Sequence, residues 1–62
     1  MATILIIDDQ ESIRALLRTT LEAEGHEVME ASNGCIGLDL YRQRPTDLVI
    51  TDILMPELSA RA

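Results

Sequence analysis

The most informative absence in this chain of 62 residues is that of lysine, because all five cationic side chains are arginines and they do not cluster. Eleven acidic residues outnumber them, and the formal net charge is −6. Nucleic acids and anionic membranes bind proteins that carry a basic patch or stripe, and this chain has neither. The composition therefore argues against both classes of partner.

Cysteine and long apolar runs are also scarce. Cys35 is the single cysteine, which excludes an intrachain disulfide, and no cluster of cysteine and histidine suggests structural zinc. No apolar run has the length of a membrane span, and the N-terminus lacks the charged head of a signal peptide. We therefore expect a cytoplasmic location. A chain this short forms at most one small domain. Because it has neither a disulfide nor a structural metal site to stabilise it, we expect it to self-associate.

The residues that are present alternate between strand and helix patterns. Continuous apolar, β-branched runs are typical of strands that are buried on both faces, and apolar residues at helical spacing indicate helices. The predicted elements are a strand over 3–7, a helix over 10–24, a weaker edge strand over 26–31, a helix over 34–44 and a strand over 48–51. This order predicts an α/β fold with parallel strands joined by right-handed crossovers.

The first helix has the clearest pattern. Ile13, Leu16, Leu17 and Leu21 form its apolar stripe, and the arginines lie mostly on the opposite side. Gly25 is expected to end it, as a residue in the left-handed region. The second helix is expected to begin with a cap in the sequence Ser-Asn-Gly and to end at a proline.

Acidic residues follow two of the predicted strands. Asp8 and Asp9 come directly after the first strand, and Asp52 comes directly after the third. If these strands are parallel neighbours, their carboxyl ends share one edge of the sheet, where open α/β sheets bind ligands. Three carboxylates so close together cannot all ionise cheaply without a cation, and Mg²⁺ prefers oxygen ligands. The pattern therefore favours a magnesium site.

Two other interpretations of these acids stay open. Asp8, Asp9 or Ser12 can cap the first helix, and Asp52 can be an ordinary turn residue. A nucleotide site is the weaker alternative, because the first turn offers Asp-Asp-Gln-Glu instead of the glycine-rich loop that cradles a phosphate.

Four features of the sequence occur together. They are the strand that runs into Asp8 and Asp9, the helix that ends at Gly25, the sequence Ala-Ser-Asn-Gly over 31–34, and Pro-Thr-Asp-Leu-Val-Ile-Thr-Asp over 45–52 running into Met-Pro. With these features, nearly the whole chain resembles the receiver domains of two-component response regulators. This resemblance implies a flavodoxin-like, doubly wound fold in which the strands seen here have the order 2-1-3.

The resemblance also implies roles for particular residues. Asp52 is the expected phosphoacceptor, which receives a phosphoryl group from a histidine kinase or phosphotransfer protein and also binds the metal. Asp9 is an expected direct ligand of Mg²⁺, Asp8 acts mainly through metal-bound water, and the backbone carbonyl of Leu54 completes the set. The resemblance implies a signalling phosphoprotein and not an enzyme.

The chain departs from the family pattern in several places. The resemblance implies that a full receiver domain has five strands and five helices. Its switch serine or threonine and its lysine follow the part that is matched by this sequence. Residues 57–60, Glu-Leu-Ser-Ala, replace the usual acid and glycine. We therefore expect residues 1–62 to be the first half of a receiver domain, impaired in switching and completed as a homodimer or higher oligomer through its exposed third strand. An inert packing fragment is the remaining alternative.

Two further residues are expected to be unremarkable. His26 follows the first helix and is expected to be a solvated turn residue. Cys35 is expected to be a bystander, because no base is placed near it in the sequence.

Overall fold

The computed structural model describes residues 1–51, so Asp52 and Leu54 lie outside the described residues. The elements are β1 (Thr3–Ile7), α1 (Glu11–Ala23), β2 (Glu27–Ala31), α2 (Gly34–Gln43) and β3 (Leu48–Thr51). Both β2 and β3 pair with β1 in parallel, in the strand order β2-β1-β3. The predicted α/β class, the order of the strands and the parallel pairing are confirmed, and each element lies within one residue of its predicted bounds.

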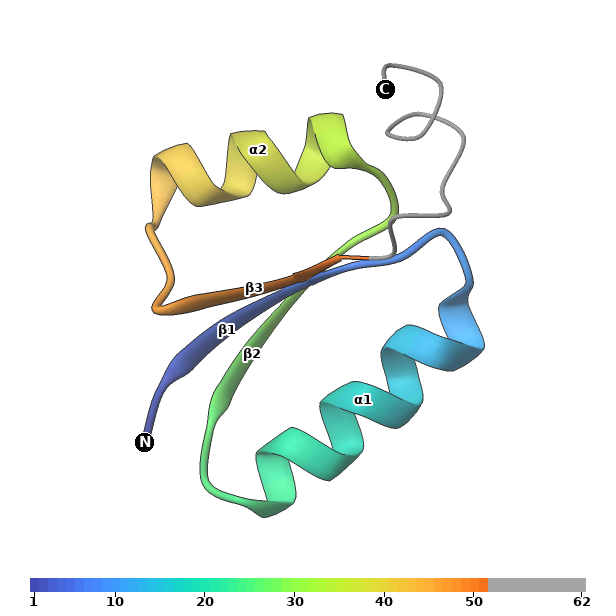
Figure 1. Cartoon of the computed structure of the whole chain (residues 1–62), viewed down its shortest axis with the longest axis vertical. Helices are drawn as coiled ribbons and strands as arrows, with labels where there is room; N and C mark the ends of the chain where they lie inside the picture. Colours follow the sequence, from blue (N-terminus) through green and yellow to red (C-terminus); the bar gives the residue numbers. More distant parts are fainter. Residues whose placement is uncertain (52–62) are drawn as a thin grey trace.

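The core of the described residues is centred on β1. Its last four residues, Ile4 to Ile7, are buried, as the continuous apolar run predicts. Helices α1 and α2 lie on opposite faces of the sheet (Figure 1), and both pack mainly against β1 and β2. Successive residues of a strand point to opposite faces, so β1 needs apolar side chains at every position.

The ends of the helices follow local chemistry. Gly25 adopts a φ of 91° directly after Glu24, the C-cap residue of α1, in the left-handed region that glycine enters without steric cost. The Asn33 side chain caps α2 by accepting a hydrogen bond from the Ile36 amide at 2.9 Å. The alternative in which Asp8, Asp9 or Ser12 caps α1 is wrong, because the N-cap residue of α1 is Gln10 and no side chain caps it.

Two expectations about α1 and the turn after it need correction. Leu17 and Leu21 are half-buried, but Ile13 and Leu16 are exposed, so only part of the predicted apolar stripe covers the sheet. His26 is half-buried, and its Nδ1 accepts a hydrogen bond from the Ala2 amide at 3.1 Å. It therefore anchors the start of the chain and is not a solvated turn residue.

Gly37 lets α2 approach the sheet closely. A Cβ atom at this position would lie 2.7 Å from Cγ1 of Ile7 and still nearer to its Cδ1. These separations are below any ordinary carbon contact. The glycine in the body of the helix therefore gives up helix propensity so that the helix can pack against β1.

Within residues 1–51, neither helix is long and apolar enough to cross a membrane.

Candidate functional site

Asp8 stands at the carboxyl end of β1 and is fixed by three hydrogen bonds. Its amide donates to the Ala31 carbonyl at 3.1 Å, which extends the pairing of β1 with β2 by one residue. Its Oδ1 accepts from the Gln10 amide at 2.8 Å, and its carbonyl accepts from Arg14 Nη1 at 2.6 Å. Asp8 is only 7% exposed. Its carboxylate is therefore oriented by the turn between β1 and α1.

Asp9 occupies the same turn but is exposed. The two neighbouring acids therefore differ: Asp8 is buried and bonded, and Asp9 is open to solvent. Both supply carboxylate oxygens, which are the ligands that Mg²⁺ prefers, usually as one or two carboxylates together with water. The chemistry of this pair fits magnesium.

The end of β3 lies beside the end of β1. Ile7 and Thr51 are partners in the parallel register, and Asp8 is the residue after Ile7. Asp52 follows Thr51 in the sequence, but its position and that of Leu54 lie outside the described residues. Among residues 1–51 there is no group of three acidic, cysteine or histidine residues that could hold a metal. The convergence of three acids therefore stays a prediction.

Arg14 is the residue at this site that the sequence reasoning missed. The helical pattern places it away from the apolar stripe, yet its side chain is only 15% exposed. It reaches the Asp8 carbonyl and also pairs with Glu30 of β2. The sequence gives only a weak indication of the ion pair: an arginine one turn into α1 and an acidic residue in β2.

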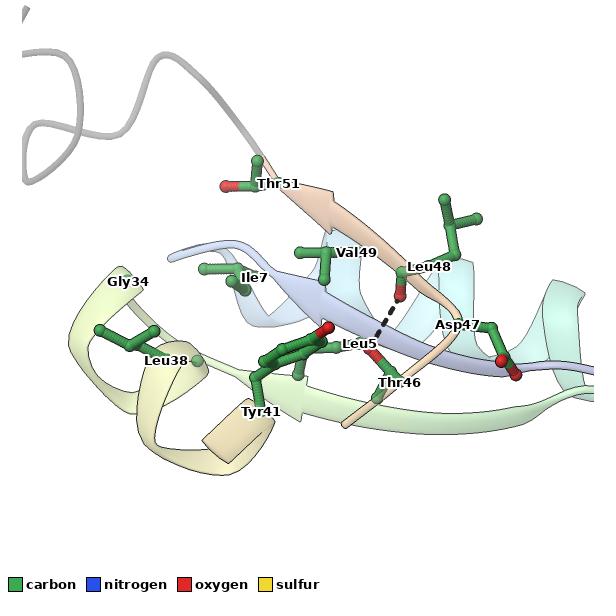
Figure 2. A pocket seen from close by; sticks show the side chains of 11 residues that line it. Leu5, Ile7, Gly34, Leu38, Tyr41, Thr46, Asp47, Leu48, Val49 and Thr51 are labelled. Atoms are coloured by element: carbon green, nitrogen blue, oxygen red, sulfur yellow. Dashed lines mark hydrogen bonds between the residues drawn. The ribbon is translucent and has the colours of Figure 1, made fainter. Parts of the chain in front are cut away.

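A groove of about 530 Å³ lies on the α2 face of the sheet, away from the acidic turn. Figure 2 shows Leu38 and Tyr41 of α2 on one side of it and Val49 of β3 on the other, with Leu5 at its floor. Leu48 points in the opposite direction from Val49 (Figure 2). The groove is largely apolar, so it offers a surface for packing and not a catalytic pocket.

A comparison with family models matches residues 4–59 to the response regulator receiver domain. The chain belongs to this family. Among solved structures, this receiver sequence is similar to a response regulator receiver domain protein from Clostridium thermocellum, with 39% identity and a TM-score of 0.85. The match covers 92% of this chain and 47% of that one. The flavodoxin-like fold implied by the sequence is thus confirmed for the described part of this receiver domain.

Curated relatives of the receiver sequence include a protein that is named as a response regulator. Protein PilH of Pseudomonas aeruginosa is 46% identical over 59 residues, which cover 95% of this chain and 49% of PilH. The polar-differentiation response regulator DivK of Brucella anthropi is 39% identical, with 92% of this chain and 46% of DivK covered. A probable transcriptional regulator, ycf27 of Porphyra purpurea, is 46% identical over 89% of this chain and 23% of its own length. The chain therefore spans about half, or less, of these relatives.

Proposed function

We propose that this receiver domain is a phosphoacceptor of two-component signalling, in which Asp52 receives a phosphoryl group from a histidine kinase or phosphotransfer protein. The observation that carries the proposal is the register of Ile7 with Thr51 in neighbouring parallel strands. Asp8 and Asp52 are the residues that follow these two partners in the sequence. Membership of the receiver family supports the same assignment.

The proposed chemistry is nucleophilic attack by a carboxylate. An oxygen of Asp52 forms a bond to phosphorus while the bond between phosphorus and the donor's histidine nitrogen breaks. The electron pair stays with the imidazole, which takes up a proton. Asp8, Asp9, Asp52 and the Leu54 carbonyl are the proposed ligands of Mg²⁺. When bound, the ion neutralises the oxygens of the phosphoryl group.

The family supports a signalling role, and we propose that the chain is not itself an enzyme and that it works in the cytoplasm. We also propose that residues 1–62 correspond to the first three strands and two helices of a receiver domain, since PilH and DivK are about twice as long. These 62 residues contain no lysine to pair with a phosphoryl group on Asp52. We therefore expect residues 1–62 on their own to be phosphorylated slowly and to switch poorly.

Phosphorylation can be tested directly with a small phosphodonor such as acetyl phosphate. Intact-mass spectrometry should show the gain of one phosphoryl group by the unmodified chain in the presence of Mg²⁺, and a smaller gain after chelation. Asp52→Asn should abolish the gain. Asp39→Asn is the matched control, because Asp39 is an exposed residue of α2. Equal labelling of the Asp52→Asn variant, or no labelling of the unmodified chain, would refute the proposal.

Self-association through β3 is the second candidate, and it rests on a specific observation. Leu48 and Val49 are 52% and 41% exposed on a strand whose outer edge has no partner strand among residues 1–51. An apolar edge of this kind is a template for pairing with another chain. A two-fold axis would pair the β3 strands of two copies in antiparallel orientation and extend the sheet.

Sedimentation velocity tests this pairing. We expect a dimer for the unmodified chain and a monomer for Val49→Lys, because an inward-pointing charge at a sheet edge blocks pairing. Leu16→Lys, on the exposed side of α1, is the control and should leave the dimer intact. Added salt should strengthen the dimer, since each copy carries a net charge of −6. A compact monomer of the unmodified chain at high concentration and high salt would refute the idea.

A further inference from the structure

The Arg14 guanidinium joins three segments of the fold at the acidic turn. Arg14 itself belongs to α1, its Nη1 donates to the Asp8 carbonyl at 2.6 Å, and its Nε donates to Glu30 Oε1 at 3.3 Å. The Asp8 carbonyl is at the end of β1, and Glu30 is in β2. One side chain therefore links the first turn of α1, the residue that follows β1, and β2.

The charge of Arg14 is partly offset by Glu30, which Arg14 shares with Arg18. Glu30 accepts from Arg14 through one carboxylate oxygen and from Arg18 Nη1 through the other, at 2.5 Å. Toward the acidic turn, Arg14 meets a neutral carbonyl and forms no hydrogen bond with the carboxylate of Asp8 or Asp9. Hydrogen bonds from a charged donor are about twice as strong as neutral ones, so this contact fixes the backbone firmly.

We propose that Arg14 is a positioning residue for the binding of a divalent cation by Asp8 and Asp9. It fixes the Asp8 carbonyl, and the Gln10 amide fixes Oδ1 of the same residue, so that the Asp8 carboxylate is held in place before the cation arrives. This inference rests on the proposed function, since it concerns the same acidic pair. Mutation of residues that hydrogen-bond to metal ligands typically lowers the affinity for the metal by about 10- to 100-fold.

The positioning role and a purely electrostatic role predict opposite changes in the affinity for Mg²⁺ when Arg14 is removed. If Arg14 acted only as a positive charge near two carboxylates, its removal would strengthen the binding of Mg²⁺. If it positions the turn, its removal weakens binding. The direction of the change therefore decides between the two roles.

The test is a titration of Mg²⁺ alone, without a phosphodonor, followed by the NMR shifts of the Asp8, Asp9 and Gln10 amides. Arg14→Ala should raise the dissociation constant about 10-fold, within the range of metal-orienting residues. Arg14→Lys should have a smaller effect, because an ammonium can bond the carbonyl but cannot reproduce the forked contact. Arg18→Ala is the control: it removes the other partner of Glu30, does not touch Asp8, and should change the constant less than 2-fold.

Outcomes of this titration separate the positioning role from the phosphoacceptor function. Unchanged or tighter binding by Arg14→Ala would overturn the positioning role and leave the phosphoacceptor proposal standing. If Arg14→Ala does not fold, the comparison of Arg14→Lys with Arg18→Ala decides in the same way. A chain that binds no Mg²⁺ at these amides overturns the inference, whereas phosphorylation of Asp52 is judged separately by mass.

Discussion

The two strands beside β1 both pair with it in parallel, but they differ in how far their side chains are buried. Met29, Leu5 and Val49 stand in register across β2, β1 and β3. Leu5 is 1% exposed and Met29 is half-buried, but Val49 is 41% exposed. Among residues 1–51, the sheet is therefore better covered on the β2 side than on the β3 side.

Charge explains much of this contrast. The acids of β2 are engaged in ion pairs: Glu30 with two arginines of α1, and Glu27 with Arg44. Charged side chains along an edge discourage pairing with other chains. In β3 the three residues before Thr51 are Leu, Val and Ile, and no salt bridge of the described residues involves this strand. The molecule thus protects one edge of its sheet and leaves the other suited to a partner.

The largest effect on stability is expected among the three residues in register across the sheet, Met29, Leu5 and Val49. Leu5→Ala should lower the free energy of unfolding by about 2–5 kcal/mol, because it leaves a cavity in the core. Val49→Ala should cost below about 1 kcal/mol, and Met29→Ala should fall between the two. Urea denaturation at low protein concentration measures all three. If Val49→Ala costs as much as Met29→Ala, the β3 side is not open in solution.

A second, smaller effect tests how closely α2 is seated on the β1 and β2 side. Gly37→Ala should destabilise the chain by about 1–2 kcal/mol, because overpacking costs about 1–3 kcal/mol and the gain in helix propensity returns up to about 1 kcal/mol. A thermal melt followed by circular dichroism should show a lower midpoint. Cys35→Ala, an exposed position in the same helix, is the matched control and should melt within 1–2 degrees or so of the unmodified chain. An unchanged midpoint for Gly37→Ala would mean that α2 can move away from Ile7.

The smallest effect concerns the charged edge itself. Arg44→Ala should change the urea midpoint by the equivalent of less than about 0.5 kcal/mol, because the pair with Glu27 is exposed and surface ion pairs contribute little. Its role lies in protecting the edge and not in holding the fold. A loss above about 1 kcal/mol would show instead that this pair helps to close the β2 side.

The parts of the fold that sequence could predict are those set by local pattern. The apolar run of β1, the glycine after α1 and the asparagine before α2 each act on near neighbours, and the structure confirms all three. The parts that it could not predict join residues far apart in the chain. Arg14 meets Glu30, and His26 meets Ala2, through contacts that no periodicity reveals.

The candidate site divides in the same way. The pattern of a strand followed by acids predicted where Asp8 and Asp9 would stand, and β1 ends directly before them. It did not predict that Asp8 is buried and that a guanidinium holds its carbonyl, because both depend on how α1 packs. The roles of Asp52 and Leu54 stay predictions.

One contact pair bears on the order in which the chain folds. Asp47 is joined to Thr3 twice: its Oδ2 accepts from the Thr3 amide at 2.9 Å, and its own amide donates to the Thr3 carbonyl at 2.8 Å. This closes a loop of 44 residues, whereas Thr3 meets Glu27 across only 24. The longer loop costs about 0.6 kcal/mol more chain entropy. We therefore expect β3 to dock after β2 and to detach before it, so that its amides exchange with deuterium ahead of those in β2.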